Sequence, residues 1–142
     1  MEVRLFYLMV LYPSWIEIPV LDLDRAVAFY SRVFQLEGVT LHEFNEDGML
    51  MRVAVLLSSD KHMKGPGVSL VQSARHQPDA KGIQVNFHVG INDVLSRALL
   101  ALMNAGGGIV KPPIDMDDGV RYAIVQDTEG NTLALSAYED NA

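Results

Sequence analysis

Glu17 and His88 are the two side chains of this sequence best placed, by type and spacing, to move a proton. Glu17 lies in W-I-E-I-P, residues 15–19, and His88 lies in V-N-F-H-V, residues 85–89. Both stretches alternate in the way that is typical of a strand with two different faces. A carboxylate and an imidazole on such faces suit a general base or a hydrogen-bonding clamp on a ligand.

The chain repeats itself in a way that relates these two positions. A shift of 71 residues places Glu17 on His88, Trp15 on Asn86 and Asp22 on Asp93. In both halves a strand-like stretch leads through an acidic residue into an amphipathic helical segment, and three strand-like segments follow. These strands are expected at residues 39–44, 49–57 and 67–72, and at residues 108–113, 120–126 and 132–138. The repeat predicts an α+β fold of two βαβββ modules, residues 14–73 and 83–138, within one domain spanning residues 1–142.

The expected helices indicate which way the first strands face. Asp22 can cap a helix that continues through Tyr30, and the second helix is expected at residues 94–105, before a run of three glycines. If Ile16, Ile18 and Val20 pack on the first helix, Trp15 and Glu17 face the other way. By the same correspondence, Asn86 and His88 also face away from the helices.

Composition excludes several classes of function. The chain of 142 residues has no cysteine, so disulfides, thiolate catalysis and sulfur-ligated zinc are excluded. The formal charge of −7 argues against nucleic acid as a partner and mildly favours cationic ligands. The apolar run at residues 5–12 is too short to cross a membrane and lacks the flanks of a secretory signal, so we expect an extra edge strand or an extension, and a cytoplasmic protein.

Two motifs resemble one known family. The D-x-x-R-A-x-x-F-Y run at residues 22–30 is similar to the first-module signature of the vicinal oxygen chelate superfamily, which includes glyoxalase, bleomycin-resistance and extradiol-dioxygenase proteins. The D-T-E-G-N turn at residues 127–131 resembles the family's Asp-Pro-Glu-Gly-Asn turn, with Thr128 in place of proline. The resemblance covers residues 14–138. It implies mixed sheets that curl into a half-open barrel, outer helices, an inner ligand cavity and a homodimer.

The resemblance also implies where a divalent metal would be held, on the first and last strand of each module. The corresponding positions are Trp15, Ser69, Asn86 and Ala134. Trp15 and Ala134 cannot ligate a metal, and Ser69 and Asn86 are poor ligands for zinc, iron or nickel. We therefore expect no metal cofactor, with a divalent ion as the less favoured alternative.

These observations predict a protein that binds a small organic ligand, cationic or aromatic, in a metal-free cavity. The expected ligand contacts are Trp15, Glu17, Ser69, Asn86 and His88. The alternative is a lyase, isomerase or dioxygenase-like enzyme that acts on a small metabolite, with Glu17 or His88 transferring the proton. The expected partners are this small molecule and a second copy of the chain, with no nucleic acid and no membrane.

Each candidate also has a purely structural interpretation. Glu17 could pair with an arginine of a neighbouring strand, such as Arg52, and His88 could be a hydrogen-bonded core histidine. The remaining histidines, His42, His62 and His76, have no spacing that would bring them together. We expect all three of them at the surface.

Overall fold

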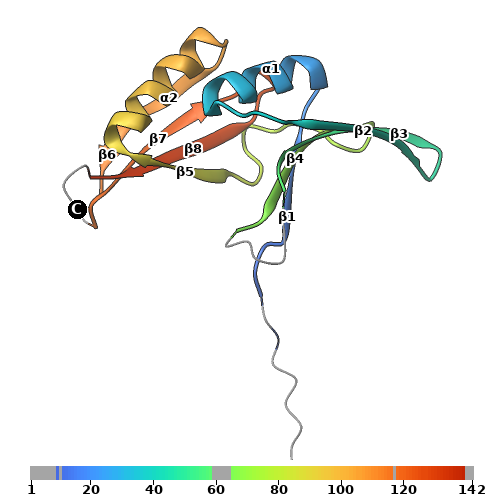
Figure 1. Cartoon of the computed structure of the whole chain (residues 1–142), viewed down its shortest axis with the longest axis horizontal. Helices are drawn as coiled ribbons and strands as arrows, with labels where there is room; N and C mark the ends of the chain where they lie inside the picture. The colour runs from blue at the N-terminus through green and yellow to red at the C-terminus, as the bar shows by residue number, and fades with distance from the viewer. Residues whose placement is uncertain (1–8, 10, 59–64, 117, 140–142) are drawn as a thin grey trace, which may run out of the picture.

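The two expected modules are present as two four-stranded sheets, each with one helix. The computed structural model describes residues 9, 11–58, 65–116 and 118–139. The first sheet has the strand order β1-β4-β3-β2 and the second the order β5-β8-β7-β6, so the second module repeats the topology of the first. Both helices lie on the same side of the strands (Figure 1). The predicted α+β fold is confirmed. The apolar run at residues 5–12 lies mostly outside the described residues.

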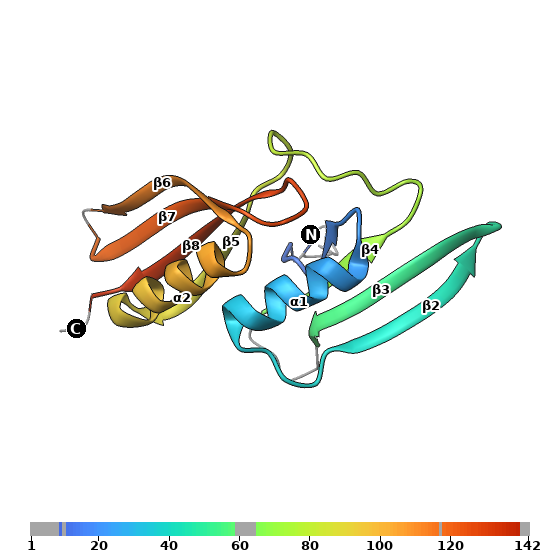
Figure 2. The same cartoon turned by 90° about the horizontal axis from the view of Figure 1, so that it is seen from above.

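The first module comprises β1 (Trp15–Pro19), α1 (Leu23–Phe34), β2 (Thr40–Glu46), β3 (Met49–Leu57) and β4 (Gly67–Gln72). Asp22 caps α1 as expected, because its carboxylate accepts a hydrogen bond from the Arg25 backbone N–H. Helix α1 packs on β3 and β4, and its buried stripe belongs to a core cluster that includes Ile18 and Leu70. β1 is parallel to β4, and β2 and β3 form a hairpin that projects away from the second module (Figure 2).

The second module comprises β5 (Val85–Ile91), α2 (Asn92–Asn104), β6 (Gly108–Asp115), β7 (Val120–Gln126) and β8 (Thr132–Tyr138). The helix starts two residues earlier than expected. Asp93 lies in its first turn and pairs with Arg97, so it does not cap the helix as Asp22 caps α1. The helix ends before Gly106, whose φ of 100° is in the region that favours glycine.

The modules are joined through their helices and through the turn between β7 and β8. Helix α1 packs against α2, and the ring of Phe34 lies 5.3 Å from that of Phe87 on β5. The carboxylate of Glu129, in the turn, accepts two hydrogen bonds from the Arg25 guanidinium, at 2.8 and 3.0 Å. Tyr30 donates to Asp127 at 2.6 Å. The two motifs that carry the family resemblance therefore contact each other.

The carboxylates of Asp127 and Glu129 in this junction are buried and hydrogen-bonded, whereas the Arg25 side chain is partly exposed. Glu129 has no exposed side-chain surface, and it also accepts hydrogen bonds from the backbone N–H groups of Leu21 and Asp22. Burial alone would raise the pKa of Glu129, but the hydrogen bonds, first that from Arg25, bring it below its ordinary value. Burial, and then the neighbouring Asp127, raise the pKa of Tyr30. The junction therefore favours the ionised form of Glu129.

Among the described residues no helix is both long and apolar enough to cross a membrane.

Candidate functional site

Strand β1 presents Trp15 and Glu17 on the face away from the helices, as its alternation predicts. Ile18 is buried and Ile16 packs against the core, whereas Trp15 is 43 % exposed and Glu17 is exposed. The register with β4 places Gly67 beside Trp15 and Ser69 beside Glu17.

The indole ring of Trp15 lies over β4, next to Gly67 and Ser69. Its Nε1–H donates a hydrogen bond of 2.9 Å to Ser69 Oγ. A methyl group at Gly67 would overlap the six-membered ring of Trp15, so the ring occupies the space that the missing side chain leaves. One face of the indole is packed and part of the ring remains exposed. β1 therefore offers an aromatic surface whose orientation is already set.

The carboxylate of Glu17 is bonded to a histidine. Glu17 Oε2 lies 2.7 Å from His76 Nε2, and His76 Nδ1 lies 2.7 Å from Ser73 Oγ. The alternative pairing of Glu17 with Arg52 is not found, because Arg52 contacts Asp24 instead. His76 was expected at the surface, but it is only 9 % exposed. His42 is exposed as expected, and His62 lies outside the described residues.

Trp15 and Glu17 line a cavity of about 430 Å³, which we call the Trp15 cavity. Its other walls come from the start of β5, the start of β8 and the segment that joins the modules. Two carboxylates line it, those of Glu17 and Asp79, and none of the described residues that line it is a lysine or an arginine. The lining therefore combines a tryptophan whose ring is held in place with an excess of acidic residues.

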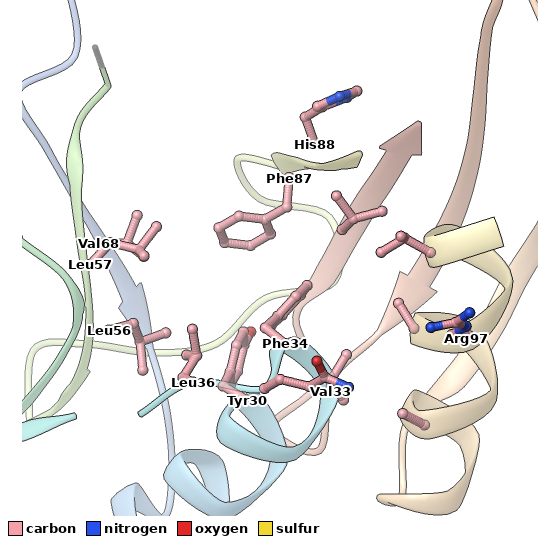
Figure 3. A pocket seen from close by; sticks show the side chains of 15 residues that line it. Tyr30, Val33, Phe34, Leu36, Leu56, Leu57, Val68, Phe87, His88 and Arg97 are labelled. Atoms are coloured by element: carbon pink, nitrogen blue, oxygen red, sulfur yellow. The ribbon is translucent and has the colours of Figure 1, made fainter. Parts of the chain in front are cut away.

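A second cavity, of about 380 Å³, lies between the modules, and we call it the interhelix cavity. Figure 3 shows Phe34 and Phe87 projecting into it from α1 and β5. His88 follows Phe87 on β5 and points away from the two rings (Figure 3). Arg97 lies at the margin and donates a hydrogen bond to Asp93. The lining is mainly apolar.

The structure does not bring the second module's candidates into the Trp15 cavity. His88 Nδ1 lies 3.3 Å from Ser136 Oγ, and its ring lies 4.4 Å from that of Tyr138. The amide oxygen of Asn86 accepts a hydrogen bond from Gln84. The expected single pocket with Glu17 and His88 is therefore not formed within the described chain. The reason is that the modules meet through helices and a turn, so their first strands do not pair.

The four positions implied for a metal do not fit one. Asn86 lies beside Ala134, and Trp15 lies beside Gly67, so neither pair supplies two ligands. Ser69 is 1 % exposed and accepts the hydrogen bond from Trp15. Across the part of the chain that the structure describes, no group of three or more His, Cys, Asp or Glu side chains could hold a metal ion.

The comparisons with known proteins agree with the fold. The sequence profile of the Glyoxalase/Bleomycin resistance protein/Dioxygenase superfamily matches residues 13–135. The chain belongs to this superfamily. No curated protein matches it by sequence.

Several solved structures are similar to this chain in fold but distant from it in sequence. A glyoxalase family protein from Bacillus cereus has a TM-score of 0.68 at 16 % identity, over 96 % of this chain and 99 % of the other. A glyoxylase/bleomycin resistance protein/dioxygenase domain from Frankia sp. EAN1pec has a TM-score of 0.67 at 16 % identity, over 94 % of this chain and 96 % of the other. The fosfomycin resistance protein FosX from Listeria monocytogenes has a TM-score of 0.59 at 16 % identity, over 91 % and 94 %.

Proposed function

We propose that this protein binds a small organic cation in the Trp15 cavity. One observation carries the proposal: Trp15, whose ring is held in place by Gly67 and Ser69, lines the same cavity as Glu17 and Asp79, with no basic side chain among the described lining residues. The face of an indole attracts cations, most strongly where water is excluded. Carboxylates on the same wall add a charge that selects the cation over its neutral analogues.

Size and net charge support the same ligand class. The cavity volume of about 430 Å³ falls in the range of small-molecule sites, roughly 300–1,000 Å³. The net charge of −7 favours the approach of cations at low salt. Ile83 and Leu133 supply apolar wall for the alkyl part of a ligand.

The five candidate residues have different parts in this proposal. Trp15 and Glu17 contact the ligand. Ser69 is buried, so we assign it to holding Trp15 in place. Contacts from Asn86 and His88 stay predictions of the sequence, because these side chains do not line the Trp15 cavity.

The test is a fluorescence titration with choline, a quaternary ammonium small enough for the cavity. Trp15 is the only tryptophan, so its emission reports this site alone. We expect saturable quenching, with Glu17→Gln weakening the affinity about fivefold and leaving the fold intact. Glu37→Gln makes the same charge change on an exposed loop residue and should have no effect. Equal losses in both variants would show only a general charge effect, and a Glu17→Gln affinity equal to the wild type would contradict the proposal.

The second candidate function is an enzyme, a lyase or an isomerase in which Glu17 accepts a proton. The hydrogen bond from His76 favours it, because a base must be held in one orientation. Such an enzyme would exchange an acidic C–H proton of a small carbonyl compound for deuterium in heavy water, and Glu17→Gln would abolish the exchange. Exchange that persisted in Glu17→Gln but was lost in His88→Gln would assign the proton transfer to His88 instead.

We further propose that the chain forms a homodimer. Large apolar side chains are exposed on an outer strand of each sheet, namely Leu41 and Phe44 on β2, and Val110 and Ile114 on β6. Outer strands also leave backbone groups that a partner can cover. A cytoplasmic location stays a prediction of the sequence, to be tested by cell fractionation.

A further inference from the structure

We infer that His76 is a positioning residue, which orients the Glu17 carboxylate for a cation in the Trp15 cavity. The inference rests on the proposed function for the class of ligand. His76 does not itself line the cavity, and it acts through Glu17.

The three groups form one chain of short hydrogen bonds from the segment after β4 to the cavity wall. Ser73 Oγ and His76 Nδ1 lie 2.7 Å apart, as do His76 Nε2 and Glu17 Oε2. The imidazole is 9 % exposed, while the Glu17 side chain is 49 % exposed. The buried histidine is thus fixed by its hydrogen bonds, and the exposed Glu17 carboxylate at the other end is open to a ligand in the cavity.

The Glu17 carboxylate can only accept a hydrogen bond, so the His76 nitrogen beside it, Nε2, carries a proton. Ser73 Oγ accepts a hydrogen bond from the Arg75 backbone N–H at 3.3 Å, which leaves its own O–H free to donate to His76 Nδ1. A neutral imidazole that accepts at Nδ1 carries its proton on Nε2. This Nε2–H then donates to Glu17 Oε2. The other carboxylate oxygen, Oε1, receives no hydrogen bond from any described residue, so it is available to a ligand.

Charged neighbours do not replace this contact. The side chain of Arg75 pairs with Glu46, with 3.4 Å between Arg75 Nη2 and Glu46 Oε1. Asp79 is on the cavity wall and has the same sign of charge as Glu17. Without His76, no described residue would hydrogen-bond to the Glu17 carboxylate, and this flexible side chain would lose its fixed geometry. Preorganised groups bind more tightly because they lose less side-chain entropy on binding.

The experiment compares choline with its neutral isostere 3,3-dimethylbutan-1-ol, both titrated against Trp15 fluorescence. In His76→Leu we expect choline affinity to fall about fivefold, while the alcohol changes by less than about twofold. In His76→Gln, whose side-chain N–H can reach the same carboxylate, we expect most of the choline affinity to return. An equal loss for both compounds, or a His76→Gln variant as weak as His76→Leu, would overturn the inference.

A second measurement decides the inference without any ligand, and also if His76→Leu fails to fold. Nitrogen-15 NMR of the imidazole of the ligand-free protein should show the Nε2–H tautomer of His76. Glu17→Gln should perturb the His76 Nε2 signal. A proton on Nδ1, or a His76 spectrum unchanged by Glu17→Gln, would overturn the inference. Failure of choline to bind the wild type, with the expected tautomer present, would instead refute the proposed ligand class.

Discussion

The orientation of Trp15 depends on the absence of a side chain at Gly67. A methyl group there would overlap the indole ring, so Gly67→Ala should force the ring off β4. We expect a shift of the Trp15 emission maximum and a decrease of about 1–3 kcal/mol in the free energy of unfolding, as is typical of overpacking. Fluorescence spectra and urea unfolding measure the two effects.

Gly82→Ala is the matched control, since Gly82 lines the Trp15 cavity. An added methyl group there would meet its nearest neighbour, an atom of Asp79, at 3.5 Å, which is ordinary contact. Its emission spectrum should match that of the wild type. If Gly67→Ala also left the emission unchanged, the indole would not lie on β4 as described.

At the residue scale, the sequence could predict faces but not partners. Alternation correctly placed Trp15 and Glu17 on the side away from the helices. The sequence could not identify His76 as the partner of Glu17, because His76 lies 59 residues away in a segment without periodicity. Arg52 was a wrong choice since it lies on β3, and β1 pairs with β4 instead. The alternation of residues within a strand carries no information about which distant loop packs against that strand.

At the scale of elements, the junction between α1 and the β7–β8 turn depends on Glu129. The pKa of Glu129 is lowered in the folded protein, so the ionised carboxylate stabilises the fold at pH values above its ordinary pKa of 4.5. This stabilisation is lost as the pH falls through the pKa of the folded protein. Glu129→Gln should lower the free energy of unfolding at pH 7 by about 2 kcal/mol, because hydrogen bonds to a charged group are lost.

The same variant should also respond less to acid. Below about pH 4.5 the wild type should lose stability more steeply than Glu129→Gln, as measured by urea unfolding at a series of pH values. Glu37→Gln, which changes an exposed glutamate, provides the control and should follow the wild type. Parallel pH curves for wild type and Glu129→Gln would show that this carboxylate is not the group responsible.

Sequence patterns predicted the elements themselves closely. Strands β3, β4, β7 and β8 have the expected bounds, because alternation and β-branched residues mark them clearly. The start of α2 was less predictable. Asp93 looked like a cap by analogy with Asp22, but it pairs with Arg97 one turn further along the helix.

At the scale of the whole molecule, the repeat predicted equal modules but not how they dock. Docking depends on particular side chains, such as Arg25 with Glu129 and Tyr30 with Asp127, whose pairing is not visible in a shift of 71 residues. This is why Glu17 and His88 correspond in sequence yet do not share a cavity in the described chain.

The proposed homodimer gives a prediction for the assembled molecule. Static light scattering at tens of micromolar, an order-of-magnitude concentration for weakly held dimers, should give twice the chain mass of 15.7 kDa. Phe44→Glu places a charge among the exposed apolar residues of β2 and should lower the dimer fraction if this strand is in the interface. A single species of chain mass at these concentrations would contradict the homodimer.

An NMR measurement of where choline binds tests the proposed cation site directly. The account predicts nuclear Overhauser effects between the N-methyl protons and the indole protons of Trp15, because a cation that binds beside Glu17 lies against the exposed part of that ring. These effects should weaken in Glu17→Gln and persist in Glu37→Gln. Choline that saturates the protein without any contact to Trp15, or that fails to bind at all, would contradict the account.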